Sequence, residues 1–349
     1  MSENDGSLKA TTQTAHESHP LDYGWSYWRE SSQRAANLHN QGHKLWTKHD
    51  LRDIEQQITQ SVNRKIFTVR AIDGNIVSMK NLNYGERHPI WKPYVKYQEY
   101  WQLVNTPPSG PPETYHCSYL VDWANETARD FRGIMSNANL VFEETKIQWK
   151  QSQSCKLLES QLRDQLGAGK VTKIICCGLG DMYRKPPEWF KRRTGSTADV
   201  DVVRPSMVQH LFALTMTEVL RNMSGEEVKL LAQDPDYTKD TIEILETNGF
   251  SVVGQFGAGG FAEIDDDSVV LSAFIRAPLK QIIADIARPI AIMSTGFTAF
   301  NDQEKPWADA DSPRTEEMWH EYHDFNFHIG PGDEELMSKL QDLHFYVRK

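Results

Sequence analysis

The sequence has little cysteine and no long apolar run. Its 349 residues include four cysteines, Cys117, Cys155, Cys176 and Cys177, of which the last two are adjacent. Neighbouring residues of a strand point to opposite faces, so this pair is poorly placed for a disulfide, and the usage indicates a reducing compartment, the cytoplasm or nucleus. No apolar run approaches the roughly 18 residues of a membrane span, and the first twenty residues lack an apolar core. We therefore expect no membrane segment and no signal peptide.

An excess of positive charge is also absent. Lysine and arginine number 38 against 48 aspartate and glutamate residues, a formal net charge of -10. Nucleic acids and membrane surfaces are anionic, so this balance predicts neither as a partner. The length suits roughly two domains.

Composition and periodicity divide the chain into four parts. Residues 1–20 are polar and aperiodic, which predicts a disordered tail. Residues 21–115 form a mixed α+β N-terminal region, which we expect to meet partner proteins. It contains a hairpin signal at Asp73-Gly74, between Ile66–Arg70 and Ile76–Met79. Residues 116–167 are predicted as a helical connector, and residues 168–349 as a Rossmann-like domain.

The connector prediction depends on apolar spacing. Residues from about Ser118 to Leu166 carry apolar side chains at three- and four-residue steps, as one face of a helix requires. The first such set is Phe131, Ile134, Met135, Ala138 and Val141, and the second is Leu158, Leu162 and Leu166. Both predict helices packed against a core.

From Val171 onward, apolar strand-like runs alternate with helical patterns. Such alternation predicts crossover units and an α/β fold, with a Rossmann-like, mostly parallel sheet and flanking helices. The predicted strands are Val171–Cys177, Val228–Ala232, Phe250–Val253, Val269–Ile275 and Pro289–Met293. The predicted helices are Met207–Leu220, Lys239–Asn248 and Leu279–Ala287.

The first of these strands runs into a glycine turn, Gly178-Leu179-Gly180, followed at once by Asp181. Such turns hold ligands in doubly wound folds, and an acidic residue after the next strand binds a ribose hydroxyl. Asp234, followed by Pro235, is the candidate for that second role. The dinucleotide fingerprint is incomplete, because Tyr183 stands where a third glycine belongs. S-adenosylmethionine and NAD(P) both suit this arrangement, and a turn without a ligand is the plainer alternative.

Between the turn and the next helix lies a basic insertion. It carries Arg184, Lys185, Lys191, Arg192 and Arg193, together with Trp189 and Phe190. Its place beside the glycine turn suits a lid whose cations meet a phosphate. A solvated basic loop is the plainer interpretation.

Two further groups of residues are candidates for binding a metal ion. Gly254 and Gly257–Gly260 follow a predicted strand, and Asp265–Asp267 come shortly after. Three aspartates suit a hard cation, but the spacing matches no calcium loop, so an acidic turn is preferred. His320 and His323 could share a helix face with His328 nearby, yet no cysteine or second pair supports them. No metal site is predicted.

The order of these motifs resembles the sensitivity-to-red-light-reduced family. The resemblance covers about Lys173 to Phe300 and rests on four elements in sequence. They are IICCGLGD, Gln209 on the next helix, Asp234-Pro235, and a helix entering Asn248-Gly249-Phe250. The run Pro278-Leu279-Lys280-Gln281-Ile282-Ile283-Ala284-Asp285 is most similar to the fungal branch.

This resemblance implies a regulatory protein, since the family is tied to light signalling and clock regulation in plants and to microtubule stability in yeast. Many members carry Pro-His-Cys where this chain has Arg276-Ala277-Pro278, so roles of that His or Cys do not transfer. Three interpretations stay open. The first is a regulatory protein binding a nucleotide-type small molecule at Gly178–Asp181, Gln209 and Asp234-Pro235. The second is a methyltransferase or oxidoreductase using the same crevice. The third, weaker one is haem binding through Cys176 or Cys177.

Overall fold

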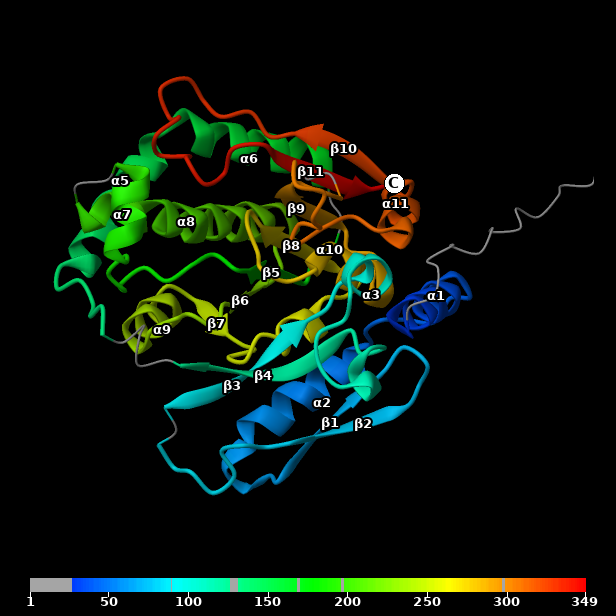
Figure 1. Cartoon of the computed structure of the whole chain (residues 1–349). Helices are drawn as coiled ribbons and strands as arrows, with labels where there is room; N and C mark the ends of the chain where they lie inside the picture. Colours follow the sequence, from blue (N-terminus) through cyan, green and yellow to red (C-terminus); the bar gives the residue numbers. More distant parts are fainter. Residues whose placement is uncertain (1–26, 89, 126–130, 168–169, 196–197, 297–298) are drawn as a thin grey trace, which may run out of the picture.

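A seven-stranded sheet forms the centre of the molecule (Figure 1). The computed structural model describes residues 27–349 apart from 89, 126–130, 168–169, 196–197 and 297–298, so the predicted tail lies outside the described residues. The strand order is β10-β11-β9-β8-β5-β6-β7, and only β11 runs antiparallel to its neighbours. The strands are β5 (Lys173–Cys177), β6 (Lys229–Gln233), β7 (Phe250–Val252), β8 (Ser268–Ser272), β9 (Ala291–Thr295), β10 (Tyr322–Asn326) and β11 (Leu343–Arg348). The prediction of an α/β fold with a mostly parallel sheet is confirmed.

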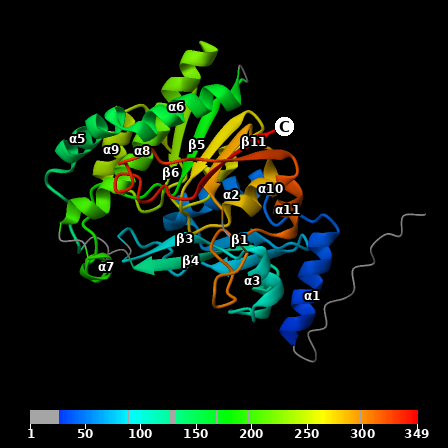
Figure 2. The ribbon, with the colours of Figure 1, turned by 90° about the horizontal axis from the view of Figure 1, so that it is seen from above.

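Each face of this sheet is covered by a different layer, as Figure 2 shows. One face packs against α5 (Ala138–Gln151), α6 (Gln153–Leu166), α8 (Asp199–Ser224) and α9 (Lys239–Thr247). The other packs against α2 (Lys48–Thr59) and α10 (Leu279–Ile286). Parallel strands covered on both faces are apolar throughout, which explains the run from Ile174 to Cys177. The core between the sheet and α8 is the first core, and it contains Cys176. The core between the sheet and α10 is the second core, and it contains Cys177, as the alternation of side chains along a strand predicts.

The N-terminal region contributes to the second core. Leu51, Phe67 and Val121 are buried in the same cluster as Ile175 of β5. This region contains two small sheets, β1 with β2 and β3 with β4. Its elements are α1 (Tyr27–Asn40), β1 (Ile66–Arg70), β2 (Ile76–Lys80), β3 (Trp91–Tyr97), α3 (Tyr100–Asn105) and β4 (Tyr119–Asn125). The predicted hairpin at Asp73-Gly74 is confirmed.

The helical prediction for residues 116–167 is wrong over its first half. Tyr119–Asn125 is the strand β4, paired antiparallel with β3, and the first apolar set does not share a helix face. Phe131 is 93% exposed and Ile134 is 46% exposed, and both precede α5. The spacing of apolar residues within this segment carries no information on β3, the distant strand that pairs with β4. The second half is helical, with a break at Ser152, whose hydroxyl caps α6.

The remaining boundaries mostly follow the predictions. The strands and helices expected between Val171 and Met293 are all present, with most ends shifted by one to four residues. The exception is α8, which begins at Asp199, eight residues before the predicted start at Met207. The sequence patterns missed β10, β11, α7 (Glu188–Thr194) and α11 (Pro313–Trp319). His320 caps α11 and His323 lies in β10, so the predicted common helix face of these histidines is wrong. Among the described residues, no helix is long and apolar enough to cross a membrane.

Candidate functional site

The turn after β5 requires glycine at two positions. Gly178 and Gly180 have φ angles of +70° and +85°, in the left-handed region that side chains disfavour. A Cβ at Gly178 would lie 3.2 Å from Ile275, which follows β8, and one at Gly180 would lie 2.7 Å from the Ser206 hydroxyl oxygen. The turn is therefore packed closely between the loop after β8 and the helix α8.

The structure brings this turn together with Asp234, as the sequence suggested. The amide of Gly180 donates to the Asp234 carboxylate at 2.8 Å, and the amide of Asp236 donates to its other oxygen at 2.9 Å. Burial of the carboxyl group raises the pKa of Asp234 to about 6, while these two hydrogen bonds act in the opposite direction. Asp234 thus joins the ends of two neighbouring strands.

The other predicted residues have different surroundings. Leu179 is buried in the core below α8, and Pro235 is exposed beside Gly257. The Asp181 carboxylate accepts hydrogen bonds from the amides of Tyr183, Arg184 and Thr238, so it links the turn to the start of α9.

Gln209 lies on α8 and is 3% exposed. Its amide nitrogen donates weakly to the carbonyl of Pro205 at 3.4 Å, and its Oε1 accepts no hydrogen bond from the described residues. No hydrogen bond among those residues connects Gln209 with the glycine turn. A buried amide oxygen without a donor is unusual, so this position suits a ligand or water partner.

Four polar residues near the turn escaped the sequence interpretation: Ser206, His210, Tyr237 and Lys339. The Lys339 ammonium donates to the Ser206 hydroxyl at 3.1 Å. Burial of that ammonium lowers the pKa of Lys339, and the charge of Asp234 acts in the opposite direction. Lys339 stands 133 residues after Ser206, and no local motif marks it.

His210 is held in one tautomer by its two partners. Its Nδ1 lies 2.7 Å from the carbonyl oxygen of Ser206, which can only accept, so Nδ1 carries the proton. Nε2 then accepts from the Tyr237 hydroxyl at 2.8 Å. Burial lowers the pKa of His210 to about 4, so the ring is neutral near pH 7.

A row of polar side chains lies at the carboxyl edge of the opposite sheet face. Gln233 pairs with Cys177, Ser272 pairs with Ser294, and the pairing of Cys176 with Leu271 places Ser272 beside Cys177. The row before it on this face is entirely apolar: Leu231, Ile175, Val270 and Ile292. Ser272 and Ser294 are each 2% exposed, and neither hydroxyl has a hydrogen-bond partner among the described residues.

A buried ionic group accompanies this polar row. The Lys280 side chain is 3% exposed, with its Nζ 3.6 Å from the Asp311 carboxylate. The amide of Lys280 donates to Asp309 at 2.9 Å. Burial raises the pKa of Asp309 to about 6, although the charge of Lys280 lowers it. Burial also raises the pKa of Cys177, with a smaller contribution from Asp309. A carboxyl group with such a pKa can exchange a proton near neutral pH.

The second glycine cluster is filled by the protein's own carboxylate. Glu55 of α2 accepts hydrogen bonds from the amides of Phe256, Ala258 and Gly259 at 2.9 to 3.0 Å. The amide of Gly260 donates to the Gln233 side chain at 2.7 Å. Consecutive amides of this kind form an anion-binding nest. Here the nest attaches the N-terminal region to the sheet domain.

The basic insertion is largely engaged with itself. Lys191 pairs with Glu188 and Asp199, and the Arg193 guanidinium lies over the rings of Trp189 and Phe190.

Asp265 of the acidic turn pairs with Lys173 at 2.6 Å. In the described parts of the chain, no cluster of three His, Cys, Asp or Glu residues is placed to hold a metal ion.

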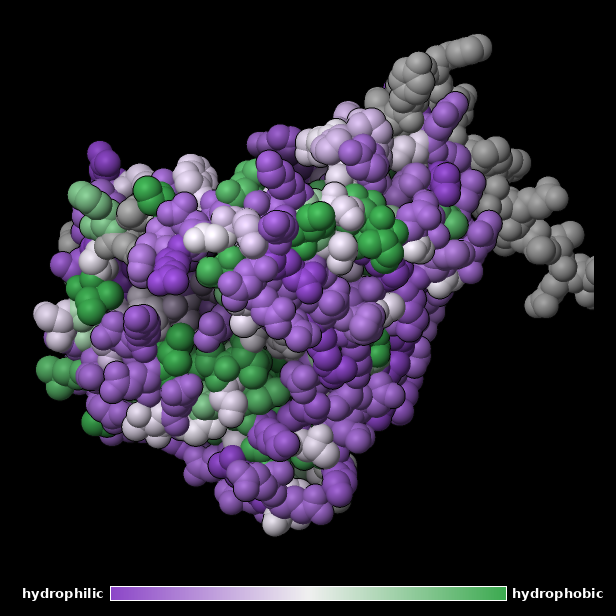
Figure 3. Space-filling view, turned by 90° about the horizontal axis from the view of Figure 1, so that it is seen from below, coloured by the Kyte–Doolittle hydropathy of each residue, from purple (hydrophilic) through white to green (hydrophobic). Residues whose placement is uncertain are grey.

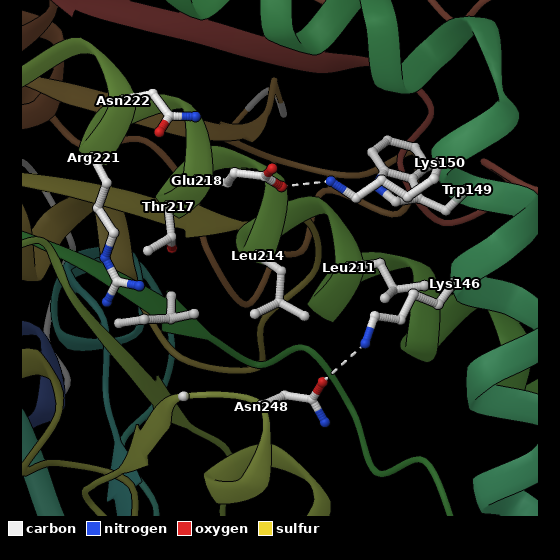
Figure 4. A pocket seen from close by; sticks show the side chains of 12 residues that line it. Lys146, Trp149, Lys150, Leu211, Leu214, Thr217, Glu218, Arg221, Asn222 and Asn248 are labelled. Atoms are coloured by element: carbon white, nitrogen blue, oxygen red, sulfur yellow. Dashed lines mark hydrogen bonds and ion pairs between the residues drawn. The ribbon is translucent and has the colours of Figure 1, made fainter.

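A cavity of about 360 Å³ opens at the other end of the sheet, between α5, α8 and the α9–β7 connection (Figure 4). Its cations have partners, since Lys150 contacts Glu218 at 2.5 Å and Lys146 donates to the Asn248 side chain at 3.3 Å. Leu230, in the amino half of β6, and Gly249, directly before β7, place it away from the glycine turn.

The surroundings of the two strand cysteines disfavour haem ligation through a thiolate. Cys176 and Cys177 are both fully buried, and burial raises the pKa of each thiol. The thiolate is the form that binds a metal, and this environment disfavours it.

These features define an α/β protein whose mostly parallel sheet carries polar groups on both faces of its carboxyl edge. The family model of the SRR1 domain matches residues 155–347, from α6 to β11, which is more than half of the chain. The protein therefore belongs to the SRR1 domain family. The match extends beyond residues 173–300, over which the motifs carried the resemblance, while the fungal branch stays a prediction. Neither the curated proteins nor the solved structures contain a match to the chain.

Proposed function

We propose that this SRR1 domain binds a nucleotide-type small molecule at the carboxyl edge of its sheet, as the ligand-sensing part of a regulatory protein. The observation that carries the proposal is the 2.8 Å hydrogen bond between Gly180 and Asp234 at adjacent strand ends. In doubly wound proteins, a glycine turn and an acid at these two positions bind the cofactor and its ribose. In this binding site Asp234 accepts a hydrogen bond from a ribose hydroxyl, beside the glycine turn at Gly178 and Gly180.

The order of the strands supports this location. After β5 the chain adds β6 and β7 on one side of β5, and then adds β8 and β9 on its other side. The direction in which strands are added therefore reverses between β5 and β8. Open α/β sheets bind ligands outside the carboxyl ends of strands at such a reversal. The buried hydroxyls of Ser272 and Ser294 lie next to it and supply polar partners for the rest of the ligand.

One observation favours a methyltransferase as the enzymatic alternative. If β5 is counted as strand 1 and β11 as strand 7, the order from β7 to β10 is 3-2-1-4-5-7-6. Strand 7, which is β11, runs antiparallel to its neighbours. Dinucleotide-binding domains of the Rossmann type have the order 3-2-1-4-5-6. An antiparallel strand inserted between the fifth and sixth is the arrangement of S-adenosylmethionine-dependent methyltransferases. This argument is an analogy between folds, and it favours S-adenosylmethionine over NAD(P) as the ligand.

A thermal-shift titration tests the proposal. The full chain is heated with S-adenosylmethionine, S-adenosylhomocysteine, NAD, NADP or ATP at increasing concentrations. A ligand at a hundred times its Kd stabilises the folded state by about 2.7 kcal/mol, which raises Tm by several degrees. Mass spectrometry of the purified protein extends the search to ligands outside this set.

Two variants locate the site. Asp234→Ala should abolish the shift, and the exposed Asp267→Asn, which removes the same charge at the opposite edge of the sheet, should retain it. A protein that responds to no nucleotide and carries no small molecule would refute the proposal. A shift that persists in Asp234→Ala would place the ligand elsewhere.

A further inference from the structure

The N-terminal region exposes an unusual concentration of apolar side chains. Fourteen large hydrophobic residues are exposed in the described part of the chain, and seven of them lie between residues 62 and 91. Six of these seven gather at one end of the β1–β2 sheet, which we call the tip: residues 62–66 and 80–92, with residue 89 outside the description. They are Val62, Ile66, Leu82, Tyr84, Ile90 and Trp91, and their exposure ranges from 39% to 70%.

Contacts show that the two segments of the tip form one surface. The amide of Asn81 donates to the Lys65 carbonyl, and the amide of Gly85 donates to the Val62 carbonyl, each at 2.9 Å. The Lys65 ammonium lies 5.3 Å from the centre of the Tyr84 ring. The tip lies at the bottom of Figure 1, where loops connect α2 with β1 and β2 with β3. Figure 3 views this side and shows hydrophobic patches among hydrophilic side chains.

The charge of the tip is opposite to that of the whole protein. It contains five basic residues, Arg64, Lys65, Lys80, Arg87 and Lys92, and one acidic residue, Glu86. The chain as a whole has a net charge of -10. An anionic surface therefore attracts the tip and repels the rest of the molecule, which selects one orientation of approach.

We propose that the tip docks on an anionic lipid surface. Exposed Leu, Ile, Trp and Tyr side chains enter the interfacial layer of a bilayer, and surrounding Lys and Arg side chains bind anionic headgroups. Leu82, Tyr84 and Ile90 lie in the connection between β2 and β3, while Ile66 and Trp91 are the first residues of β1 and β3. Exposed aromatic and aliphatic side chains together with a local excess of basic residues suit an anionic bilayer. The sequence-based expectation of no membrane partner used the net charge of the whole chain, which hides this local reversal. This proposal is independent of the nucleotide site.

Co-sedimentation with vesicles tests the proposal. The full chain should pellet with vesicles of equal parts phosphatidylserine and phosphatidylcholine, and remain in the supernatant with pure phosphatidylcholine. Raising the salt concentration should reduce the bound fraction, because it screens the attraction between the tip and the headgroups.

Matched pairs of surface variants identify the surface. Lys80→Gln with Arg87→Gln, and separately Leu82→Ser with Ile90→Ser, should each weaken binding at least tenfold. The controls are Lys156→Gln with Lys239→Gln, and Leu140→Ser with Leu157→Ser, which change exposed side chains of the same kinds elsewhere. Both control pairs should bind like the unmodified protein.

Three results would overturn the proposal. The first is absence of binding to anionic vesicles at low salt. The second is equal binding by the tip variants and their controls. The third comes from sedimentation velocity without lipid: if the unmodified chain is a dimer and the tip variants are monomers, the tip is a contact between two copies of the chain. Circular dichroism of each variant confirms that it is folded.

Discussion

The backbone amide of Gly180 donates a hydrogen bond of 2.8 Å to the carboxylate of Asp234, a residue 54 positions later in the chain. This contact joins the carboxyl ends of β5 and β6. A ribose hydroxyl that binds Asp234 must share this oxygen with Gly180 or use the one that accepts from Asp236. The turn and the acid are therefore coupled, and a change at either residue should affect the other.

Replacement of Gly180 by alanine should destabilise the fold strongly. The new Cβ would meet the Ser206 hydroxyl at 2.7 Å, and φ is +85°. Left-handed strain and overpacking together cost about 2–4 kcal/mol in the free energy of unfolding, measured by urea denaturation. Gly225→Ala is the control, because Gly225 has a φ of +69° with no atom near its Cβ position. A loss no larger than that of the control, about 1 kcal/mol, would show that Ser206 does not pack against Gly180.

Replacement of Asp234 by asparagine should alter the pH dependence of stability. Burial raises the pKa of Asp234 to about 6, above that of the unfolded chain, so the fold favours the protonated carboxyl. The contribution of this group is present below about pH 4 and is lost as pH rises through 6. Asp234→Asn avoids this loss, so its stability relative to the unmodified protein should increase by roughly 1–2 kcal/mol between pH 4 and pH 7.

The corresponding control is Asp267→Asn, an exposed carboxylate. If the two variants show the same pH dependence in chemical denaturation, the Asp234 carboxyl does not titrate as described.

Glu55→Gln should weaken the attachment of the N-terminal region to the sheet domain. The carboxylate accepts three amide hydrogen bonds, from Phe256, Ala258 and Gly259, and a neutral amide replaces one acceptor oxygen by a donor. We expect a loss of about 2–3 kcal/mol in the free energy of unfolding. Glu144→Gln on the exposed side of α5 should cost less than about 0.5 kcal/mol. Equal stability of both variants would show that the nest does not depend on Glu55.

His210 should remain neutral in the folded protein from pH 5.5 upward, with its proton on Nδ1. Burial lowers the pKa of its ring to about 4, and the Ser206 carbonyl accepts the Nδ1 proton. Nitrogen-15 chemical shifts of the ring report both the charge and the tautomer. In Tyr237→Phe the Nε2 shift should move, because its hydrogen-bond donor is lost. A protonated ring at pH 6 would be incompatible with this geometry.

The four thiols should react slowly in the native protein. Cys117, Cys155, Cys176 and Cys177 are all buried, and burial raises the pKa of each, to about 12 for Cys117. Ellman's reagent should modify far less than one thiol per chain in buffer and all four in denaturant. Rapid reaction of a thiol without denaturant would indicate local opening at that cysteine.

Local sequence signals were sufficient where neighbouring residues determine the structure. The glycine turn at Gly178 and Gly180 was recognisable because its left-handed backbone excludes other residues. Alternating apolar runs gave the strands β5 to β9 and the helices between them. The place of Asp234 beside the turn followed from the rule that carboxyl ends of parallel strands meet at one edge.

The sequence did not indicate the groups that come together from distant segments. Lys339 reaches Ser206 across 133 residues, and Glu55 fills a nest about 200 residues later in the chain. The spacing of apolar residues predicts a helix where β4 lies, because the pairing partner β3 is outside any local window.

The sequence by itself therefore determined the strand and helix alternation, the glycine turn and the SRR1 domain motifs, since each depends on backbone sterics or short-range periodicity. Only the tertiary structure decided what occupies the second glycine cluster and where the polar row of Ser272 and Ser294 lies. It also showed that the basic and apolar tip is a single surface. Such groupings depend on strand register and on contacts between distant segments, and neither leaves a periodic trace in the chain.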